Sequence, residues 1–535
     1  MKKIIILIVA TVLCLCTLFA GCGDSTGYKN TVTSSSFAGI PKSNGGFAVE
    51  KGEYVYYING VEVNTADNTY GKVVKGALVR TKLADLGTNN AAAEMVVPAL
   101  FVTGSYNAGF YIYGDNIYYA SPRSEKNKEG EVENSKLDFF KTSFDGKKAV
   151  NLVTVDDNTT NYRFVEVGSV VYLVLETVNA DGEKVLKVIN TTDTKAEPYE
   201  TKKLESVIFA NGEQDSDIYF TRVKHNETLE KDEAYNEIYR LVLGATIEEK
   251  LVLSGNGLYP TDDQQVTSGF GIQGVKFTLV KDLENAVIVK VDYVETDVTT
   301  VTNYYAIEKN GYNYVRINNG TVTASSIFTD ASLYKYDAEN DSVSILYLDA
   351  SLGLMKYEYS EANKENNKVN DYRTRLFYDK DLVTYTVKFW NGEYLYLTDS
   401  NNYYHRVNYS VLLDNDDTTV ASVEQITCLA SSTSWYQPEI IGDYFLTVYS
   451  AEPYNSMVFV RKNEAFEKDE ESDKYLEIEA IQKSDIESIE NNLKLRLGLA
   501  TDELTESIHS YYRNTFGAKA YKEYFGEEKY NEYFG

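Results

Sequence analysis

The chain has 535 residues, with 52 lysines and arginines against 80 aspartates and glutamates, and a formal net charge of −28. This acidic balance disfavours nucleic-acid binding, which needs basic groups to neutralise phosphates, and it predicts repulsion from anionic lipid head groups. Tyrosine is unusually frequent, at 46 residues against 7 prolines. Because tyrosine fits pleated, half-buried surfaces, the composition favours β-strands in a body large enough for a sizeable core or two domains.

The N-terminus has three successive parts. Two lysines precede an uncharged apolar run from Ile4 to Ala20, and Gly21 then leaves little bulk beside Cys22. This order is typical of a secretory signal. The segment LFAGC resembles the lipobox of bacterial lipoproteins, although Phe19 stands where that family usually has leucine. The resemblance implies cleavage before Cys22 and a lipid on its thiol, of the diacylglycerol type that carries palmitate. An uncleaved membrane anchor and an ordinary signal peptide are the alternatives.

We therefore expect a signal peptide over residues 1–21, and a lipidated Cys22 with a flexible stalk to residue 44. All of these alternatives place the folded body outside the cytoplasm. For the lipoprotein, the location is the outer face of a bacterial cell membrane, with the lipid anchor as the link to that membrane. Of the four cysteines, only Cys428 would remain free in the exported body, so no internal disulfide is expected. An exported chain without disulfides fits a bacterial protein better than a eukaryotic one.

Six short segments repeat one pattern, a turn followed by alternating apolar and aromatic residues. They are GEYVYYING from Gly52, GDNIYYASP from Gly114, GSVVYLVLE from Gly168, DSDIYFTRV from Asp215, NGEYLYLTD from Asn391 and IGDYFLTVY from Ile441. Their central apolar residues lie 47 to 62 residues apart, except for one interval of 177 that has room for about three such units. Alternation with a period of two predicts strands, and a repeat near 50 residues is typical of β-propeller blades.

A second element follows several of these segments, as in LDFFKTSFDGKKAVNLV (137–153), which reads as strand, Asp-Gly turn, strand. Each unit then supplies four antiparallel strands, the content of one blade. We expect an all-β fold, a β-propeller of about seven or eight four-stranded blades over residues 45–481. A stack of β-sandwiches is the alternative.

The segments Gly114–Tyr119, Leu137–Gly146 and Ile238–Arg240 carry a further likeness. They are similar to an extracellular bacterial domain family of unassigned function, whose propeller is related to the six-bladed kind in lipoprotein receptors. The likeness covers roughly residues 48–255 and 388–460. It implies a propeller and contributes no functional residues.

The C-terminal segment, residues 482–535, changes to a helical pattern. A capping box at Ser484 predicts one helix, and Thr501 predicts the start of a second that Gly517 ends. Two near copies follow, YKEYFG (521–526) and YNEYFG (530–535). We expect their aromatic side chains to pack on the propeller flank; an exposed docking tail is the alternative.

Few residues offer catalytic or metal chemistry. The three histidines, His225, His405 and His509, are far apart in the sequence, so no local zinc motif exists. The segment LDNDDTT places Asp414, Asp416 and Asp417 close together, which is a weak calcium candidate because it lacks the rest of a calcium loop. An acidic turn is the alternative reading. No other cofactor is expected.

Tyrosine and tryptophan residues outside the repeated strands are the candidate ligand contacts, since such rings offer a flat apolar face and a polar edge. This set comprises Trp390, Tyr403, Tyr404, Trp435 and Tyr436. The sequence favours a surface-anchored binding module that uses propeller loops to hold an envelope protein, peptide or glycan. The alternatives are an extracytoplasmic hydrolase with carboxylates as acid and base, and an assembly or structural factor acting through the C-terminal helices.

Overall fold

The fold was analysed in a computed structural model. It describes the ranges 31–32, 39–61, 75–88, 91–101, 109–126, 128–130, 132–144, 149–157, 159–210, 218–226, 233–255, 259–260, 266–267, 275–296, 299–310, 314–318, 325–349, 353–360, 373–377, 385–408, 423–432, 436–450, 456–481 and 501–535.

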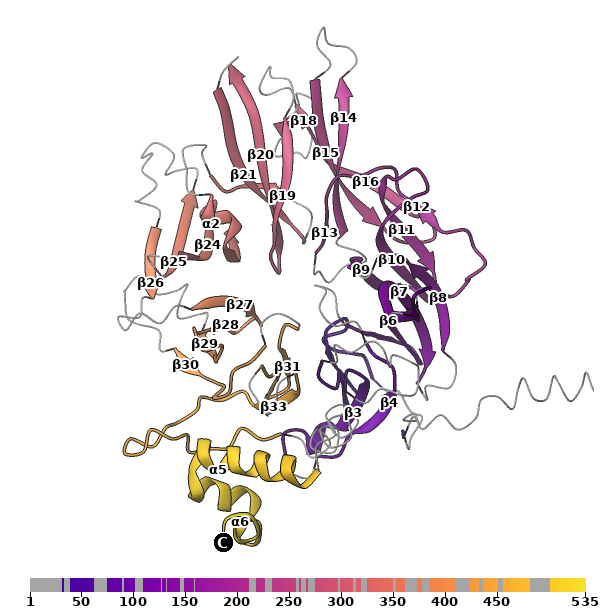
Figure 1. Cartoon of the computed structure of the whole chain (residues 1–535). Helices are drawn as coiled ribbons and strands as arrows, with labels where there is room; N and C mark the ends of the chain where they lie inside the picture. Colours follow the sequence, from indigo (N-terminus) through magenta and orange to yellow (C-terminus); the bar gives the residue numbers. More distant parts are fainter. Residues whose placement is uncertain are drawn as a thin grey trace, which may run out of the picture.

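The described strands form eight antiparallel sheets that follow one another around a ring (Figure 1). Seven of these sheets have four strands and the eighth has three, always in the order of the sequence. A two-stranded ribbon, β17 and β18, lies between the fourth and fifth sheets in the sequence. The prediction of a propeller with seven or eight blades is confirmed, with eight blades.

Blades 1 to 4 occupy the first half of the chain. Their strands are, for blade 1, β1 (Ala48–Lys51), β2 (Tyr54–Ile58), β3 (Leu78–Lys82) and β4 (Glu94–Val97); for blade 2, β5 (Tyr111–Tyr113), β6 (Asn116–Lys126), β7 (Val132–Ser143) and β8 (Val150–Val155); for blade 3, β9 (Tyr162–Val167), β10 (Val170–Val178), β11 (Lys184–Asn190) and β12 (Tyr199–Glu200); and for blade 4, β13 (Val207–Phe209), β14 (Ile218–Asn226), β15 (Glu233–Val242) and β16 (Glu248–Ser254). The 3-10 helix η2 (Leu83–Asp85) follows β3.

Blades 5 to 8 complete the ring after the ribbon of β17 (Tyr259–Pro260) and β18 (Val266–Thr267). Their strands are, for blade 5, β19 (Lys276–Asp282), β20 (Ala286–Thr296), β21 (Thr299–Glu308) and β22 (Tyr314–Arg316); for blade 6, β23 (Ala331–Asp337), β24 (Ser342–Asp349), β25 (Gly353–Ser360) and β26 (Arg373–Phe377); for blade 7, β27 (Thr386–Trp390), β28 (Tyr394–Thr398), β29 (Tyr404–Asn408) and β30 (Glu424–Gln425); and for blade 8, β31 (Glu439–Ile441), β32 (Tyr444–Val448) and β33 (Val458–Lys462). A short helix, α2 (Ser326–Thr329), precedes β23.

The repeated Gly-x dipeptide in the sequence is the turn between the first and second strands of a blade. In blade 2, Tyr113 pairs with Asn116 across Gly114 and Asp115, and Gly114 has a φ of 55°. A two-residue hairpin loop needs a positive φ, which glycine adopts without strain. The same two-residue turn begins at Gly52, Gly168 and Gly442 in blades 1, 3 and 8.

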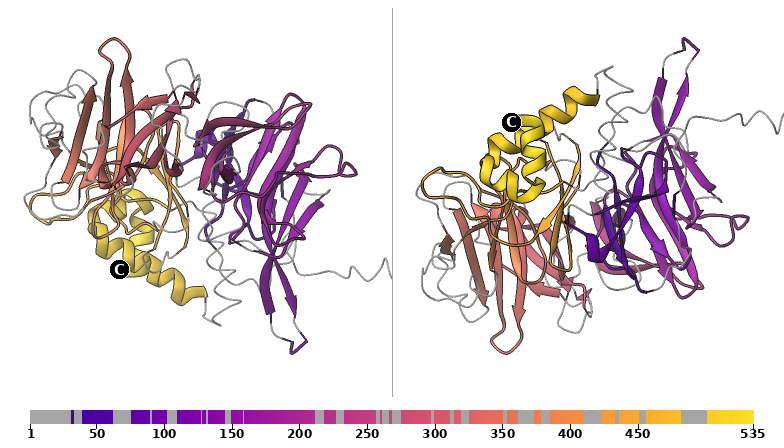
Figure 2. Two further views of the ribbon diagram at one scale, coloured as in Figure 1. Left: turned by 90° about the horizontal axis from the view of Figure 1, so that it is seen from above. Right: turned by 90° about the horizontal axis from the view of Figure 1, so that it is seen from below.

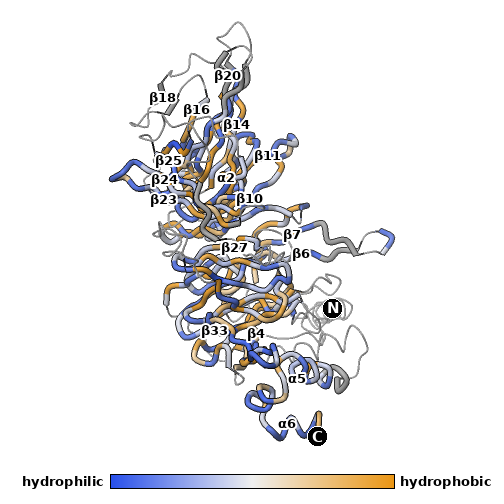
Figure 3. The backbone as a smooth tube through the Cα atoms, turned by 90° about the vertical axis from the view of Figure 1, so that its left-hand side faces the viewer, coloured by the Kyte–Doolittle hydropathy of each residue, from blue (hydrophilic) through white to orange (hydrophobic). Residues whose placement is uncertain are grey.

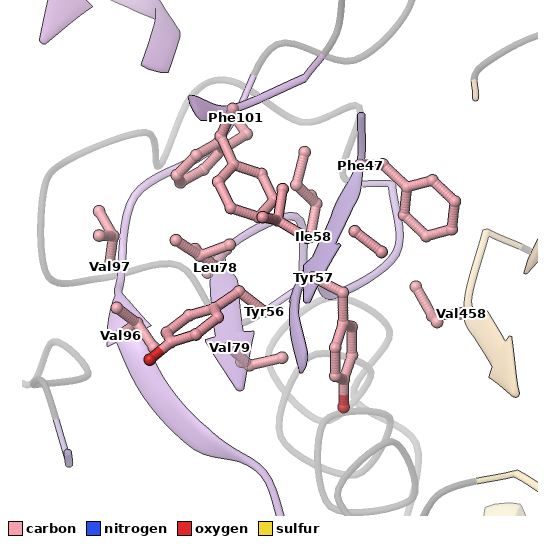
Figure 4. Packing of buried hydrophobic residues seen from close by; sticks show 14 of the residues in the cluster. Phe47, Tyr56, Tyr57, Ile58, Leu78, Val79, Val96, Val97, Phe101 and Val458 are labelled. Carbon is pink, nitrogen blue, oxygen red and sulfur yellow. The ribbon is translucent and has the colours of Figure 1, made fainter. Parts of the chain in front are cut away.

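The core lies between blades rather than within them. Buried apolar side chains form a cluster between each successive pair of blades from blade 2 to blade 8. One more cluster joins blades 8, 1 and 2, so the ring is closed. Figure 4 shows Val458 of blade 8 beside Phe47, which precedes β1, and Tyr57 of β2 in this cluster. Burial of both faces of each sheet explains why a single blade would not be stable alone.

Asparagine side chains also tie neighbouring parts of the ring together. Asn44 accepts a hydrogen bond from the backbone N–H of Ile112 (2.7 Å) and donates one to its carbonyl (3.2 Å). Asn236 of blade 4 makes the same pair of bonds to Phe277, the second residue of β19 in blade 5. Each asparagine side chain therefore bonds to the backbone of a blade's first strand in the way a neighbouring strand would. These bonds satisfy the backbone N–H and C=O groups at that edge of the blade.

The described part of the C-terminal tail consists of α5 (Thr501–Phe525) and α6 (Glu527–Phe534). The expected helix at Thr501 is confirmed, and Gly517 marks a break within it, with a φ of 87°. The helix expected at Ser484 lies outside the described residues. Both views in Figure 2 show these helices against the later blades. Aromatic residues of both six-residue copies, among them Tyr521 and Phe534, pack in a cluster with blade 8, as expected.

No helix within the described ranges is both long and apolar enough to span a bilayer.

Candidate functional site

The predicted ligand contacts occupy different environments. Tyr404 is only 1% exposed, and its ring lies 5.2 Å from that of Phe445, between blades 7 and 8. Tyr436 is also buried and stacks on Phe47 at 5.2 Å. Trp390, at the end of β27, and Tyr403, just before β29, are half-buried. Trp435 lies outside the described residues. Tyr404 and Tyr436 therefore belong to the core, and the ligand-binding role of the set stays a prediction.

The other predicted site residues cannot be placed. Cys22 and the three aspartates, Asp414, Asp416 and Asp417, lie outside the described residues. Within the described ranges, no group of three or more histidine, cysteine, aspartate or glutamate side chains is arranged to hold a metal ion. The calcium site therefore stays a prediction.

His405 is held in a structural pair. Its Nε2 lies 3.2 Å from Oδ2 of Asp399, and both side chains are buried. The other oxygen of Asp399 accepts the backbone N–H groups of Asn401 and Tyr403, at 2.9 Å each. The pair thereby fixes the turn between β28 and β29, and Tyr385 packs edge-on against the histidine ring. His405 therefore has a structural role, which is to hold this turn in place.

The hairpins of blades 2, 4 and 5 have the longest second and third strands in the ring, whereas these strands have 9 and 7 residues in blade 3 and 8 each in blade 6. The second and third strands have 11 and 12 residues in blade 2, 9 and 10 in blade 4, and 11 and 10 in blade 5. The same strands of blades 1, 7 and 8 have five residues each. Five additional residues in a strand add roughly 17 Å. In Figure 3 the β6–β7 hairpin projects to the right and the β14 and β20 strands project upward.

We call these three the projecting hairpins: β6–β7, β14–β15 and β20–β21. Each has a polar pair across its strands near the body of the ring. Arg123 Nε lies 2.8 Å from Asp138 Oδ2 in the first, and Lys224 Nζ lies 3.9 Å from Glu237 Oε2 in the second. In the third, the Thr302 hydroxyl donates to Asp292 at 2.6 Å. Cross-strand pairs of this kind stabilise a hairpin's register, so the three hairpins leave the ring in defined positions.

A buried polar group lies where the segment that precedes the C-terminal tail packs against the ring beside blade 8. Glu479 has no exposed surface, and its Oε2 accepts the backbone N–H of Cys428 at 3.0 Å and its thiol at 3.2 Å. Tyr449 and Arg461 flank the same carboxyl group. We call these four residues the junction cluster. Burial raises the pKa of Glu479 to about 7, while the Arg461 guanidinium opposes this rise.

Cys428 is a poor nucleophile in this position. Burial, followed by the neighbouring Glu479 carboxylate, raises the pKa of its thiol well above the ordinary value. A thiol that stays protonated and enclosed is chemically inert. The cysteine therefore serves as a hydrogen-bond donor to Glu479, three residues before the tail.

A second glutamate with a raised pKa lies on the first strand of blade 8. Glu439 Oε1 faces Gly46 so closely that a Cβ atom there would lie 1.8 Å away. Burial raises the pKa of Glu439 to about 8, and a hydrogen bond from Ser43 partly opposes this effect. The side chain keeps some solvent exposure although protein surrounds it. Sequence analysis singled out neither Glu439 nor Glu479, because their environments are created by segments distant in the chain.

Comparisons with solved structures find likenesses of low similarity. The propeller domain of the Trilobed protease from Pyrococcus furiosus is 11% identical, with a TM-score of 0.33 over 74% of this chain and 99% of that one. Dipeptidyl peptidase 4 from Porphyromonas gingivalis is 11% identical, with a TM-score of 0.35 over 82% of this chain and 61% of that one. Sqt1 from Saccharomyces cerevisiae is 11% identical, with a TM-score of 0.30 over 81% of this chain and 97% of that one.

This chain thus spans less than two thirds of the dipeptidyl peptidase. No protein-family model matches the sequence, and no curated protein is similar to it. At TM-scores below 0.5 these likenesses support no conclusion about activity or ligand.

Proposed function

We propose that this protein is an extracytoplasmic binding module that engages its ligand with the projecting hairpins. One observation supports the proposal above the others: the second and third strands of blades 2, 4 and 5 are about twice as long as those of blades 1, 7 and 8. The short blades demonstrate that five residues suffice for a place in the ring. The additional length therefore serves something outside it, and segments that project from a rigid scaffold commonly carry recognition.

The proposal includes a lipid anchor on Cys22, which would hold the ring at the outer face of a bacterial membrane. The ligand class proposed is an envelope protein, a peptide or a glycan. A net charge of −28 favours partners that are neutral or basic.

Binding is tested with the exported body, residues 30–535, in a pull-down from envelope extract beside a glycan array. In a first variant, a Gly-Asn dipeptide replaces residues 124–134, which leaves strand residues 116–123 and 135–143 and brings the β6–β7 hairpin close to the length of the one in blade 6. We expect at least a tenfold loss of affinity for the captured ligand. A matched control replaces the turn 179–183 of blade 3 and should bind like the wild type. Equal binding by all three proteins, or no capture at all, would refute the proposal.

Anchoring is tested separately with Cys22→Ala in the full chain. We expect this variant to leave the membrane fraction and to lose incorporation of labelled palmitate. Retention of both would exclude the lipid and leave the binding proposal untouched. The hydrolase and assembly alternatives stay predictions.

A further inference from the structure

The C-terminal tail reaches the ring through an extended segment, residues 464–481, which we call the strap. Phe466 donates its backbone N–H to the carbonyl of Gln425 at 2.7 Å, beside the outermost strand of blade 7. The Gln425 side chain in turn donates to the Tyr475 hydroxyl at 2.9 Å. Further along, the Ile481 N–H donates to the hydroxyl of Tyr512 in α5 at 3.1 Å. The strap thus lies between the ring and the first tail helix, in contact with both.

Glu479 is the point where the strap enters the junction cluster. One of its oxygens is satisfied by Cys428, as described above. The other oxygen, Oε1, is buried and makes no well-formed hydrogen bond within the part of the chain that the structure describes. The hydroxyl of Tyr449 is also buried and lies close enough to this carboxyl group to interact with it. An ionised carboxylate enclosed in such a place is costly, whereas a neutral carboxyl group is tolerated.

We propose that the protonation state of Glu479 controls docking of the tail on blade 8: the tail is held while the carboxyl group is neutral and is released when it ionises.

The surrounding groups leave Glu479 as the residue that titrates near neutrality in the cluster. Burial raises the pKa values of Cys428 and Tyr449, so both stay neutral. Arg461 stays cationic over this range; it stacks on Phe466 at 3.4 Å and lies 3.7 Å from the exposed Glu477. The remaining nearby groups, all tyrosines with raised pKa values, are neutral: Tyr403, Tyr475 and Tyr511.

The sign of the effect follows from the two pKa values. In the released tail the carboxyl group has its ordinary pKa of 4.5, and in the docked tail its pKa is about 7. The Glu479 carboxyl group therefore takes up a proton when the tail docks and loses it when the tail is released. Docking consequently weakens as the pH rises through this window. These values make the docking equilibrium on the order of 50-fold less favourable at pH 8 than at pH 5.

One group in the tail acts in the opposite direction. His509 of α5 stacks on Tyr533 of α6 at 4.2 Å, and burial lowers its pKa. Its protonation at acid pH opposes packing between the two helices. The test therefore starts at pH 5.5, and a His509→Gln variant separates this contribution from that of Glu479.

The test is hydrogen exchange of the full chain at pH 5.5, 6.5, 7.5 and 8.5, expressed as protection factors so that intrinsic exchange rates cancel. We expect protection in α5 and in the strap to fall at least tenfold over this range, while that of β28 and β32 changes less. In Glu479→Gln, protection should stay high at every pH, because a neutral amide can accept from Cys428 and donate to Tyr449. The matched control, Glu477→Gln, changes an exposed carboxyl group two residues away and should keep the wild-type profile.

Alkylation of Cys428 provides a second readout that needs no substitution. The thiol is 2% exposed under the docked tail, so its rate relative to a free model thiol should rise at least tenfold between pH 6 and pH 8.5. A pH-independent protection profile in the wild type, the same pH dependence in Glu479→Gln, or a constant relative alkylation rate would each overturn the proposal.

Discussion

Two glutamates with raised pKa values lie at blade 8, and their surroundings differ. Glu439, on its first strand, faces Gly46 and Ser43 of the segment that precedes blade 1, and no cation appears among the causes of its raised pKa. Glu479 comes from the C-terminal strap and has Arg461 close by. The pKa is raised to about 8 in the first case and to about 7 in the second. The Arg461 guanidinium, followed by hydrogen bonds from Tyr449 and Cys428, opposes the effect of burial on the pKa of Glu479, whereas Ser43 alone does so for Glu439.

The largest effect is expected from Gly46→Ala, which tests how tightly the Glu439 site is packed. A Cβ atom at residue 46 would lie 1.8 Å from Glu439 Oε1, so either the strand or the glutamate must move. We expect the free energy of unfolding to fall by about 3 kcal/mol in urea denaturation. Gly244→Ala is the matched control, because the nearest atom there is 3.6 Å away, and its change should stay within about 0.5 kcal/mol. Equal losses in the two variants would contradict the packing.

Arg461→Met removes the cation from the junction cluster. We expect a loss of about 2–3 kcal/mol at pH 8 and a clearly smaller loss at pH 5, because Glu479 is neutral at the lower pH and no longer needs the guanidinium. Arg406→Met is the control, since Arg406 pairs with the partly exposed Glu424 at 2.6 Å; its loss should not depend on pH between 5 and 8. If Arg461→Met were equally harmful at both pH values, the guanidinium would not act on Glu479.

Glu439→Gln probes the site that lacks a cation. In the wild type the folded state keeps a proton that the unfolded chain loses above pH 4.5, so stability falls as the pH rises towards 8. Glutamine cannot ionise, so the variant should be more stable than the wild type by about 1–2 kcal/mol at pH 8.5 and equal to it at pH 4. Parallel stability curves from pH 4 to 8.5 would refute this account of the site. Glu393→Gln, in an exposed turn of blade 7, should leave the curve unchanged.

Cys428→Ala should have the smallest effect, a loss of about 1 kcal/mol at pH 5.5, where Glu479 is docked, because one hydrogen bond to its carboxyl group disappears while the backbone bond stays. Cys428→Ser keeps a donor at that position and should recover at least half of the loss. Thermal denaturation of the two variants side by side measures the difference. A serine variant no better than alanine would indicate that the thiol matters only for its volume.

Much of the ring could be predicted because the turns between the first and second strands of several blades have a recognisable sequence. The dipeptides that begin at Gly52, Gly114, Gly168 and Gly442 need a positive φ, and this need is visible in the sequence. The interval of 177 residues contains blades 5 and 6, whose turns between the first and second strands lack the Gly-x dipeptide. In blade 6 the turn is longer and the positive φ falls on Asp341. The repeated sequence pattern therefore did not include these two blades, because their turns are of a different type.

The junction cluster could not be predicted because the local pattern points the other way. In the strap, Leu476, Ile478 and Ala480 alternate with two glutamates, which by periodicity would place the glutamates in solvent. Instead Leu476 is 47% exposed and Glu479 is fully buried. Contacts with Cys428, 51 residues away in the sequence, override the pattern. The ligand contacts could not be predicted either, because aromatic residues are used in the core as well as at binding surfaces. Tyr404 and Tyr436, for example, proved to be core residues.

The bonds that the segment before blade 1 makes to blades 1 and 2 have a mechanical consequence. Upstream of Asn44, Thr31 pairs with Met95 on the last strand of blade 1, through backbone and side-chain bonds of 2.9 and 2.7 Å. A chain anchored at Cys22 would therefore transmit tension first to these two bonds, next to the backbone bonds between Lys42 and Glu50 of β1, and then to the amide bonds between Asn44 and Ile112 of β5. Force along such an anchor would thus be divided between blades 1 and 2, and no single strand would carry the whole load.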